Sequence, residues 1–228
     1  MKVLHRMTGI IAGVATIVFL LITAFEIAAY SDYGWYEKAY EKYEVLDDLE
    51  MDMSHVMEVT KEMMAYLRGN RDDLVVQTVV DGEQREFFNE REKAHMVDVQ
   101  NLFLGGLWLR RGTILLIVLT IIFLVKTKAD WKKLLPQSFL IGTASFIGIT
   151  AGAGALFLSD FNQYFTLFHE IFFDNDLWLL DPRVSIMINM FPEPFFFAMV
   201  FTIAALFAGI LIVLWIYSIL KQKKLQKV

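Results

Sequence analysis

Two histidines, His95 and His169, are the side chains of this 228-residue sequence best suited to proton transfer. Each stands just outside a long apolar segment, and an imidazole can serve as a base or an acid near neutral pH. Glu92 and Asp98 lie three residues before and after His95, so a helix would place them on its face. A carboxylate there can hold the imidazole in one tautomer. Either histidine alone would suit an interfacial polar position, but the pair favours catalysis, with Glu92 and Asp98 as orienting residues.

The segment that carries His169, residues 159–194, is dense in aromatic side chains. Large aromatics are typical of the membrane interface, where an apolar ring body and a polar edge both find partners. An interfacial location does not explain the interleaved polar residues, since polar groups near hydrocarbon are costly unless they are satisfied or used. These polar residues are His169, Asn175, Asp176, Asp181 and Asn189. The segment is therefore predicted to be an active-site loop.

Apolar segments of spanning length indicate an integral membrane protein. Hydrophobic residues make up 56% of the chain, and its mean hydropathy is +0.47. A helix needs about 20 apolar residues to cross the hydrocarbon core. The segments that qualify are residues 10–30, within an N-terminal region 1–30, and residues 139–158 and 195–220. Residues 102–125 reach spanning length only with Arg110 and Arg111 inside the segment. The predicted fold is an all-α integral membrane protein with four transmembrane helices.

Lysine and arginine residues set the predicted orientation. They gather ahead of the first span, in residues 126–138 and in residues 221–228, which an even number of spans puts on one side. The positive-inside rule makes that side the cytosol. Residues 31–101 and 159–194 then face outward and carry most of the acidic residues. The net charge of -5 belongs to these outer segments and gives no indication of a nucleic-acid partner.

Glycine-containing patterns predict two local features. The outer segment 31–101 is expected to form a small domain of helices and a short β-hairpin, because Asp81-Gly82 between two strand-like runs is a hairpin turn signal. In the third span, Gly148 and Gly152 form a GxxxG pattern, which predicts close helix packing.

Four runs of residues carry a resemblance to a known family. The first is Phe87-Phe88-Asn89 followed by Glu92-x-x-His95-Met96-x-Asp98-Val99. The second is Phe168-His169-x-x-Phe172-Phe173-x-Asn175-x-x-Trp178-x-x-Asp181-Pro182. The third is Ile188-Asn189-x-Phe191-Pro192-Glu193-x-Phe195-Phe196, and a weaker fourth comprises Met53-Ser54 and Tyr66-Leu67-x-Gly69. Together they resemble the bacterial lipoprotein intramolecular transacylase family, called Lit, over nearly the whole chain.

The resemblance implies intramolecular O-to-N acyl transfer on a diacylglyceryl-modified bacterial lipoprotein. The sn-2 acyl chain would move to the α-amine of the N-terminal cysteine, which gives the lyso-form lipoprotein. The substrate supplies the nucleophile, so we expect no cofactor and no metal. The partners implied are diacylglyceryl-cysteine lipoproteins and membrane lipids, and the site implied is on the extracytoplasmic face of the bacterial cytoplasmic membrane.

This chemistry assigns roles to the candidate residues. His95 would be the base and His169 the acid, or the reverse, because the sequence does not order them. Asn175 and Asn189 are candidate donors to the oxyanion. Trp178 is expected to contact substrate or lipid. For Arg110 and Arg111, a buried ion pair with Glu26 is the favoured interpretation, and contact with a substrate carbonyl or a lipid headgroup is the functional alternative.

Other functions remain open from the sequence. A metal-dependent hydrolase could use the histidines and nearby carboxylates as ligands, but His169-Glu170 lacks the second histidine of an H-E-x-x-H site. An intermolecular membrane acyltransferase or lipid hydrolase would act on a separate lipid. A non-enzymatic membrane scaffold or sensor would tolerate replacement of both histidines. The chain has no cysteine, which excludes thiol chemistry.

Overall fold

The structure, a computed structural model, describes residues 1–225, and all of their side chains except those of residues 149–151, 153–159, 161 and 225. Its elements in chain order are α1 (Lys2–Tyr30), α2 (Tyr33–Lys42), α3 (Val45–Leu49), α4 (Met53–Leu67), β1 (Gln77–Val80), β2 (Glu83–Glu86), α5 (Glu90–Lys126), α6 (Trp131–Ser159), α7 (Phe161–Phe172), α8 (Ile186–Met190) and α9 (Glu193–Leu225).

The chain divides into two compact units. Unit 1 contains residues 1–25 and 107–165 and the described residues from Ile203 onward, and unit 2 contains residues 26–106 and 166–202. Unit 1 thus holds most of the apolar helical segments, and unit 2 holds the β-hairpin and both candidate histidines.

Three helices among the described residues are long and apolar enough to cross a membrane, over Lys2–Tyr30, Glu90–Lys126 and Glu193–Lys224. The chain is therefore a multi-pass membrane protein. The predicted span at 139–158 lies in α6, where most of the later side chains are outside the described residues, so the fourth span stays a prediction. Helix α5 has 37 residues, more than a span needs, and its charged part before Leu102 is too polar for the hydrocarbon core.

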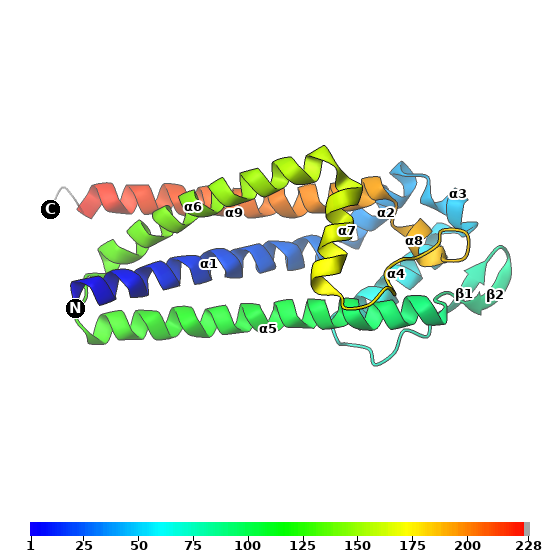
Figure 1. The fold of residues 1–228 in the computed structure, drawn as a ribbon, viewed down its shortest axis with the longest axis horizontal. Coiled ribbons are helices and arrows are strands. Elements are labelled where there is room, and N and C mark those ends of the chain that lie inside the picture. Colours follow the sequence, from blue (N-terminus) through cyan, green and yellow to red (C-terminus); the bar gives the residue numbers. More distant parts are fainter. Residues whose placement is uncertain (226–228) are drawn as a thin grey trace. The chain divides into compact units, whose positions relative to one another are not determined.

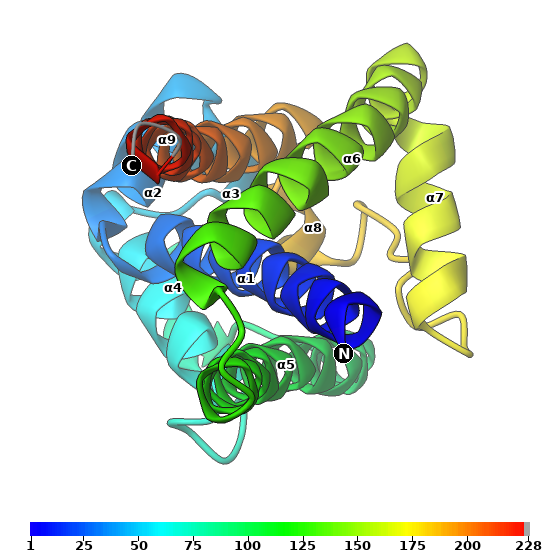
Figure 2. The same cartoon turned by 90° about the vertical axis from the view of Figure 1, so that its left-hand side faces the viewer.

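Within unit 1, α1 lies between α5 on one side and α6 and α9 on the other (Figure 1, Figure 2). Helices α1 and α6 approach closely because Gly13 has no side chain: an added Cβ would lie 2.9 Å from the carbonyl oxygen of Ser138. Around Gly148 and Gly152, no described atom lies within 4 Å of an added Cβ, apart from each glycine's own helix backbone. The close packing predicted for the GxxxG pattern is therefore found at another glycine.

Unit 2 has an aromatic core with satisfied polar edges. Tyr40 is completely buried, stacks on Phe195 at a ring-centroid distance of 5.7 Å, and shares a 2.9 Å hydrogen bond with Thr60. The Tyr36 hydroxyl donates to the carbonyl oxygen of Ala29 over 3.0 Å. These bonds let the large rings supply apolar burial without leaving their hydroxyl groups unsatisfied.

A two-stranded antiparallel sheet stands where the Asp81-Gly82 signal predicts a hairpin. Val80 pairs with Glu83, and both turn residues have left-handed backbone, with φ of 52° at Asp81 and 72° at Gly82. Positive φ at both central residues is what a two-residue hairpin turn requires. Just after the hairpin, the backbone leads directly into α5.

Candidate active site

The N-terminus of α5, which carries His95, is fixed by a reciprocal pair of hydrogen bonds. The Glu92 backbone N–H donates to the Asn89 side-chain oxygen over 3.0 Å, and the Asn89 N–H donates to Glu92 Oε2 over 2.7 Å. This is a capping box, which satisfies backbone donors that the first helical turn leaves without partners. The position of His95, one turn further on, is therefore set by the start of the helix.

The other oxygen of the same carboxylate holds a distant part of the chain. Glu92 Oε1 accepts from the Ser185 hydroxyl over 2.6 Å and from the Met187 backbone N–H over 2.9 Å. Glu92 is completely buried, and Ser185 is 2% exposed. The expected contact between Glu92 and His95 is thus replaced by bonds that attach the beginning of α8 to the beginning of α5.

His95 and His169 come together in unit 2. Their ring centroids are 6.1 Å apart and each side chain is 7% exposed, although the residues are on α5 and α7. Phe173 lies against both, at ring-centroid distances of 5.4 Å from His95 and 5.4 Å from His169. The two imidazoles therefore share a small, largely apolar environment from which water is mostly excluded.

The surroundings of His95 favour its neutral form. Burial, together with the nearby His169, lowers the pKa of His95 to about 4, against the opposing charge of Asp98. Its Nδ1 atom is buried and has no hydrogen-bond partner among the residues that the structure describes. At neutral pH the imidazole is uncharged and has a ring nitrogen free for an incoming group.

Asp98 does not bond to His95 and instead fastens the segment after α7. Its Oδ2 atom accepts from Asn175 Nδ2 over 2.8 Å. The carbonyl oxygen of Asn175 accepts from the Trp178 indole N–H over 2.9 Å, and the Trp178 ring lies 4.9 Å from that of His169. A continuous chain of contacts therefore runs from α5 to the face of His169.

The remaining predicted site residues lie elsewhere. Asn189 Nδ2 donates to the Pro182 carbonyl oxygen over 3.0 Å, so this amide stabilises the segment between residues 182 and 189. Arg110 and Arg111 belong to unit 1, where the Arg111 guanidinium lies 4.8 Å from the centre of the Trp108 ring. Their predicted contacts with substrate or lipid stay predictions.

Three residues near the site have no role assigned to them by the sequence-based prediction. Ser185 caps α8 as well as bonding to Glu92, and its spacing from Ile188 is a detectable capping signal. Arg91 donates a hydrogen bond to the carbonyl oxygen of Asp176 and lies 3.5 Å from its carboxylate. Phe173, which lies against both histidines, stands in the second run of the family resemblance, but nothing there assigns it a role.

The geometry suits a reaction that moves protons at two points of one substrate. The ring centroids are 6.1 Å apart, so the two imidazoles are close enough to serve neighbouring atoms of one substrate. A neutral imidazole can accept a proton while its neighbour donates one. Dry surroundings also strengthen every polar interaction with the substrate.

Comparisons with known proteins agree on one family. The family model described as "Lipoprotein intramolecular transacylase Lit" matches residues 10–196. The fold is similar to an in meso structure of the membrane-integral lipoprotein intramolecular transacylase Lit from Bacillus cereus, with a TM-score of 0.76, 20% sequence identity and 100% of both chains covered. A search of the curated proteins gives no match.

Structures of two variants of the Bacillus cereus protein are also similar. The variant with a histidine-to-arginine mutation has a TM-score of 0.74 and 19% identity, with 99% of this chain and 95% of that chain covered. The variant with alanine in place of a histidine has a TM-score of 0.76 and 19% identity, with 100% and 97% covered. At these identities the structures show a shared fold, whereas the family model covers most of the sequence. The chain therefore belongs to the Lit family of lipoprotein intramolecular transacylases.

Proposed function

We propose that His95 and His169 together catalyse the family's intramolecular acyl transfer in this protein. The observation that carries the proposal is their burial in one apolar environment, with ring centroids 6.1 Å apart. The substrate is a lipoprotein whose N-terminal cysteine bears a diacylglyceryl group and a free α-amine. The sn-2 acyl chain moves from the glyceryl oxygen to that amine, which leaves a lyso-form lipoprotein.

The reaction is the aminolysis of an ester. The neutral amine attacks the ester carbonyl carbon and a C–N bond forms, while the carbonyl oxygen becomes an oxyanion. A base must take the proton of the amine, and an acid must protonate the glyceryl oxygen as the C–O bond breaks. No bond to the enzyme is needed, because donor and acceptor belong to one molecule. Holding them together supplies several kcal/mol of the rate enhancement.

His95 is assigned the role of the base. Its lowered pKa keeps it neutral at physiological pH, and its Nδ1 atom has no partner among the described residues. His169 then donates a hydrogen bond to the carbonyl oxygen as the oxyanion forms and a proton to the glyceryl oxygen as the C–O bond breaks. The proton that His95 took from the amine passes to His169 and restores both imidazoles. The order of roles that the sequence leaves open is thus proposed from the electrostatic surroundings of His95.

Asn175 and Asn189 are assigned positioning roles in place of oxyanion binding. Each side-chain amide donates within the protein, Asn175 to Asp98 over 2.8 Å and Asn189 to Pro182 over 3.0 Å. The first bond supports Trp178 against His169. Trp178 is in turn the aromatic wall on which the apolar part of the substrate rests.

The active site is proposed to face the extracytoplasmic side of the bacterial cytoplasmic membrane. Exposed lysines cluster at the α5–α6 junction and at the end of α9, the ends that the positive-inside rule places in the cytosol. The polar start of α5, which bears His95, is at the opposite end of that helix. A lipoprotein anchored in the outer leaflet would meet the site there.

Tandem mass spectrometry of a synthetic diacylglyceryl-cysteine lipopeptide tests this assignment. The transfer is an isomerisation, so fragmentation must locate the acyl chain on oxygen or on nitrogen. Wild-type protein should move it to nitrogen without added lipid, and His95→Ala and His169→Ala should each lose at least about a hundredfold in kcat, in line with lost acid or base catalysis.

His55→Ala is the matched control, since His55 is a half-buried histidine on α4 without a catalytic assignment. It should retain the wild-type rate. Full turnover in either site variant would contradict the two-histidine assignment. Uptake of a labelled chain from added phospholipid would indicate an intermolecular acyltransferase instead.

A further inference from the structure

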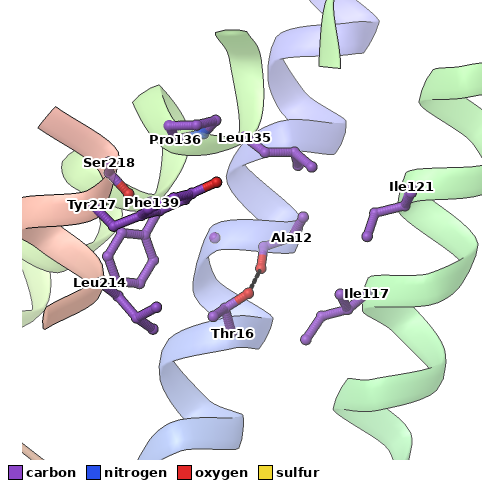
Figure 3. A pocket seen from close by; sticks show the side chains of 11 residues that line it. Ala12, Thr16, Ile117, Ile121, Leu135, Pro136, Phe139, Leu214, Tyr217 and Ser218 are labelled. Atoms are coloured by element: carbon purple, nitrogen blue, oxygen red, sulfur yellow. Dashed lines mark hydrogen bonds between the residues drawn. The ribbon is translucent and has the colours of Figure 1, made fainter. Parts of the chain in front are cut away.

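A cavity of about 230 Å³ lies in unit 1, between α1, α5, α6 and α9. Figure 3 shows Ile117 and Ile121 pointing from α5 toward α1, with Phe139 and Leu214 on the other side. Thr16, Tyr217 and Ser218 bring the hydroxyl groups of the lining, and that of Thr16 donates to the Ala12 carbonyl oxygen over 2.8 Å; the other lining residues are apolar. The lining is therefore almost entirely apolar.

A cavity of this kind favours hydrocarbon over water. A buried water needs two to four polar partners, whereas an apolar cavity of about 150 Å³ can stay dry and take up an apolar ligand. The helices around the cavity also expose apolar side chains to their surroundings, as Val118 at 46% and Ile122 at 44% do on α5. In a bilayer, the hydrocarbon beside these side chains is the acyl chain of a lipid.

Positive charge lies within one or two helical turns of the cavity wall. Lys132 precedes the lining residue Pro136 by one turn of α6, and Lys126 follows Ile121 in α5. At 1.5 Å per residue, these offsets amount to roughly 6–8 Å along each helix. Lys126, Lys132 and the adjacent Lys133 are all exposed, and Asp130 is the acidic residue between them.

The basic start of α6 is also bonded to the end of α9. The Gln222 side chain of α9 donates to the Lys133 carbonyl oxygen of α6 over 2.7 Å. Pro136 has no N–H, so it leaves the first turns of α6 with one hydrogen bond fewer. The start of α6, which carries Lys132 and Lys133, is therefore bonded to another helix that lines the cavity.

We propose that this cavity holds one acyl chain of an anionic phospholipid, whose headgroup lies against Lys126, Lys132 and Lys133. Basic pockets between transmembrane helices on the cytoplasmic side suit anionic headgroups, and each lysine near such a surface strengthens the attraction. The site is separate from the acyl-transfer chemistry and would bind a lipid as a structural component of the helix bundle.

Native mass spectrometry of the full-length protein tests the proposal. Protein in mild detergent is mixed with equal amounts of phosphatidylglycerol and phosphatidylcholine, and the retained lipids are identified. The wild type should keep one phosphatidylglycerol in preference to phosphatidylcholine. Ile121→Trp should lose it because the indole fills the cavity, whereas the matched Ile122→Trp, on an exposed neighbour, should keep it.

The triple substitution of Lys126, Lys132 and Lys133 by Gln tests the contribution of the lipid headgroup to binding separately from that of the acyl chain. It leaves the cavity wall unchanged and should reduce the preference for phosphatidylglycerol roughly a hundredfold. Equal retention of both lipids by the wild type would overturn the proposal. So would an undiminished preference in the triple variant, which remains informative even if Ile121→Trp fails to fold.

Discussion

His95, the proposed base, has surroundings that favour its neutral form at neutral pH. Burial and the neighbouring His169 lower its pKa to about 4, so protonation of the ring does not compete with catalysis until the medium is strongly acidic. The α-amine of a peptide has an ordinary pKa of about 7.7–8.0 and must be neutral to attack. On the proposed assignment, protonation of the substrate amine, and not protonation of His95, limits the rate between these two pKa values.

The pH profile of kcat/KM for the lipopeptide should therefore show a single ionisation on its acid side. Between roughly pH 5 and 7, log kcat/KM should rise with a slope of one, from deprotonation of the amine alone. A base with the usual histidine pKa near 6.5 would steepen the slope toward two below that pH. A measured slope of two in this range would show that the base is not His95 in its buried, neutral form.

The residue types in the sequence predict which side chains could do chemistry better than they predict the contacts of those side chains. Both histidines could be selected from the sequence because imidazole is rare here and two of them stand next to apolar segments. Glu92 shares a helical face with His95, yet its carboxylate is used by Asn89, Ser185 and Met187. The Asn89-x-x-Glu92 spacing is itself a capping-box signal, whereas a bond to a residue 93 positions later leaves no local pattern.

At the scale of elements, Glu92 is the contact that joins α5 to the start of α8. Its carboxylate accepts three hydrogen bonds from these segments while completely buried. Removing an acceptor strands a buried donor, which costs more than the bond itself contributes.

Glu92→Gln should accordingly destabilise the protein, because the amide NH₂ that replaces one oxygen meets a donor. The expected loss is about 1–3 kcal/mol, seen as a fall in the melting temperature on the order of 5 °C. Glu90→Gln is the control: Glu90 is on the same turn, its side chain is 93% exposed, and its ion pair with Lys93 is a surface contact. Equal melting temperatures for the two variants would refute the joining role.

Local elements differ in how well the sequence predicts them. The hairpin follows from Asp81-Gly82 because the turn's backbone requirement is met by the two residues themselves. Helix packing depends on both partners, so a GxxxG pattern alone does not locate it. Gly13 fits against α6 because the Ser138 backbone stands opposite, and no such neighbour is described for Gly148.

At the scale of the whole molecule, the distribution of charge predicts which ends of the helices face the cytosol. The absence of cysteine from the sequence makes a direct test simple. Single cysteines at Glu83 in β2 and at Lys223 in α9 replace exposed side chains at positions predicted to lie on opposite sides of the membrane.

In intact bacterial cells, a membrane-impermeant maleimide should label Glu83→Cys and not Lys223→Cys. Both variants should react after the cells are permeabilised, which controls for accessibility. Labelling of Lys223→Cys in intact cells would reverse the proposed orientation and place the active site in the cytosol.

The Glu92 hydrogen bonds also impose an order on biosynthesis. This carboxylate accepts a hydrogen bond from the backbone N–H of Met187, which is 95 residues further along the chain. At about 5–20 residues per second, a ribosome needs roughly 5 to 20 s to make that stretch. Glu92 is therefore synthesised well before the segment that it binds, and a nascent chain that stops short of Ser185 lacks the hydrogen bonds that join α5 to the start of α8. The junction between α5 and α8 can therefore form only after residue 187 has been translated.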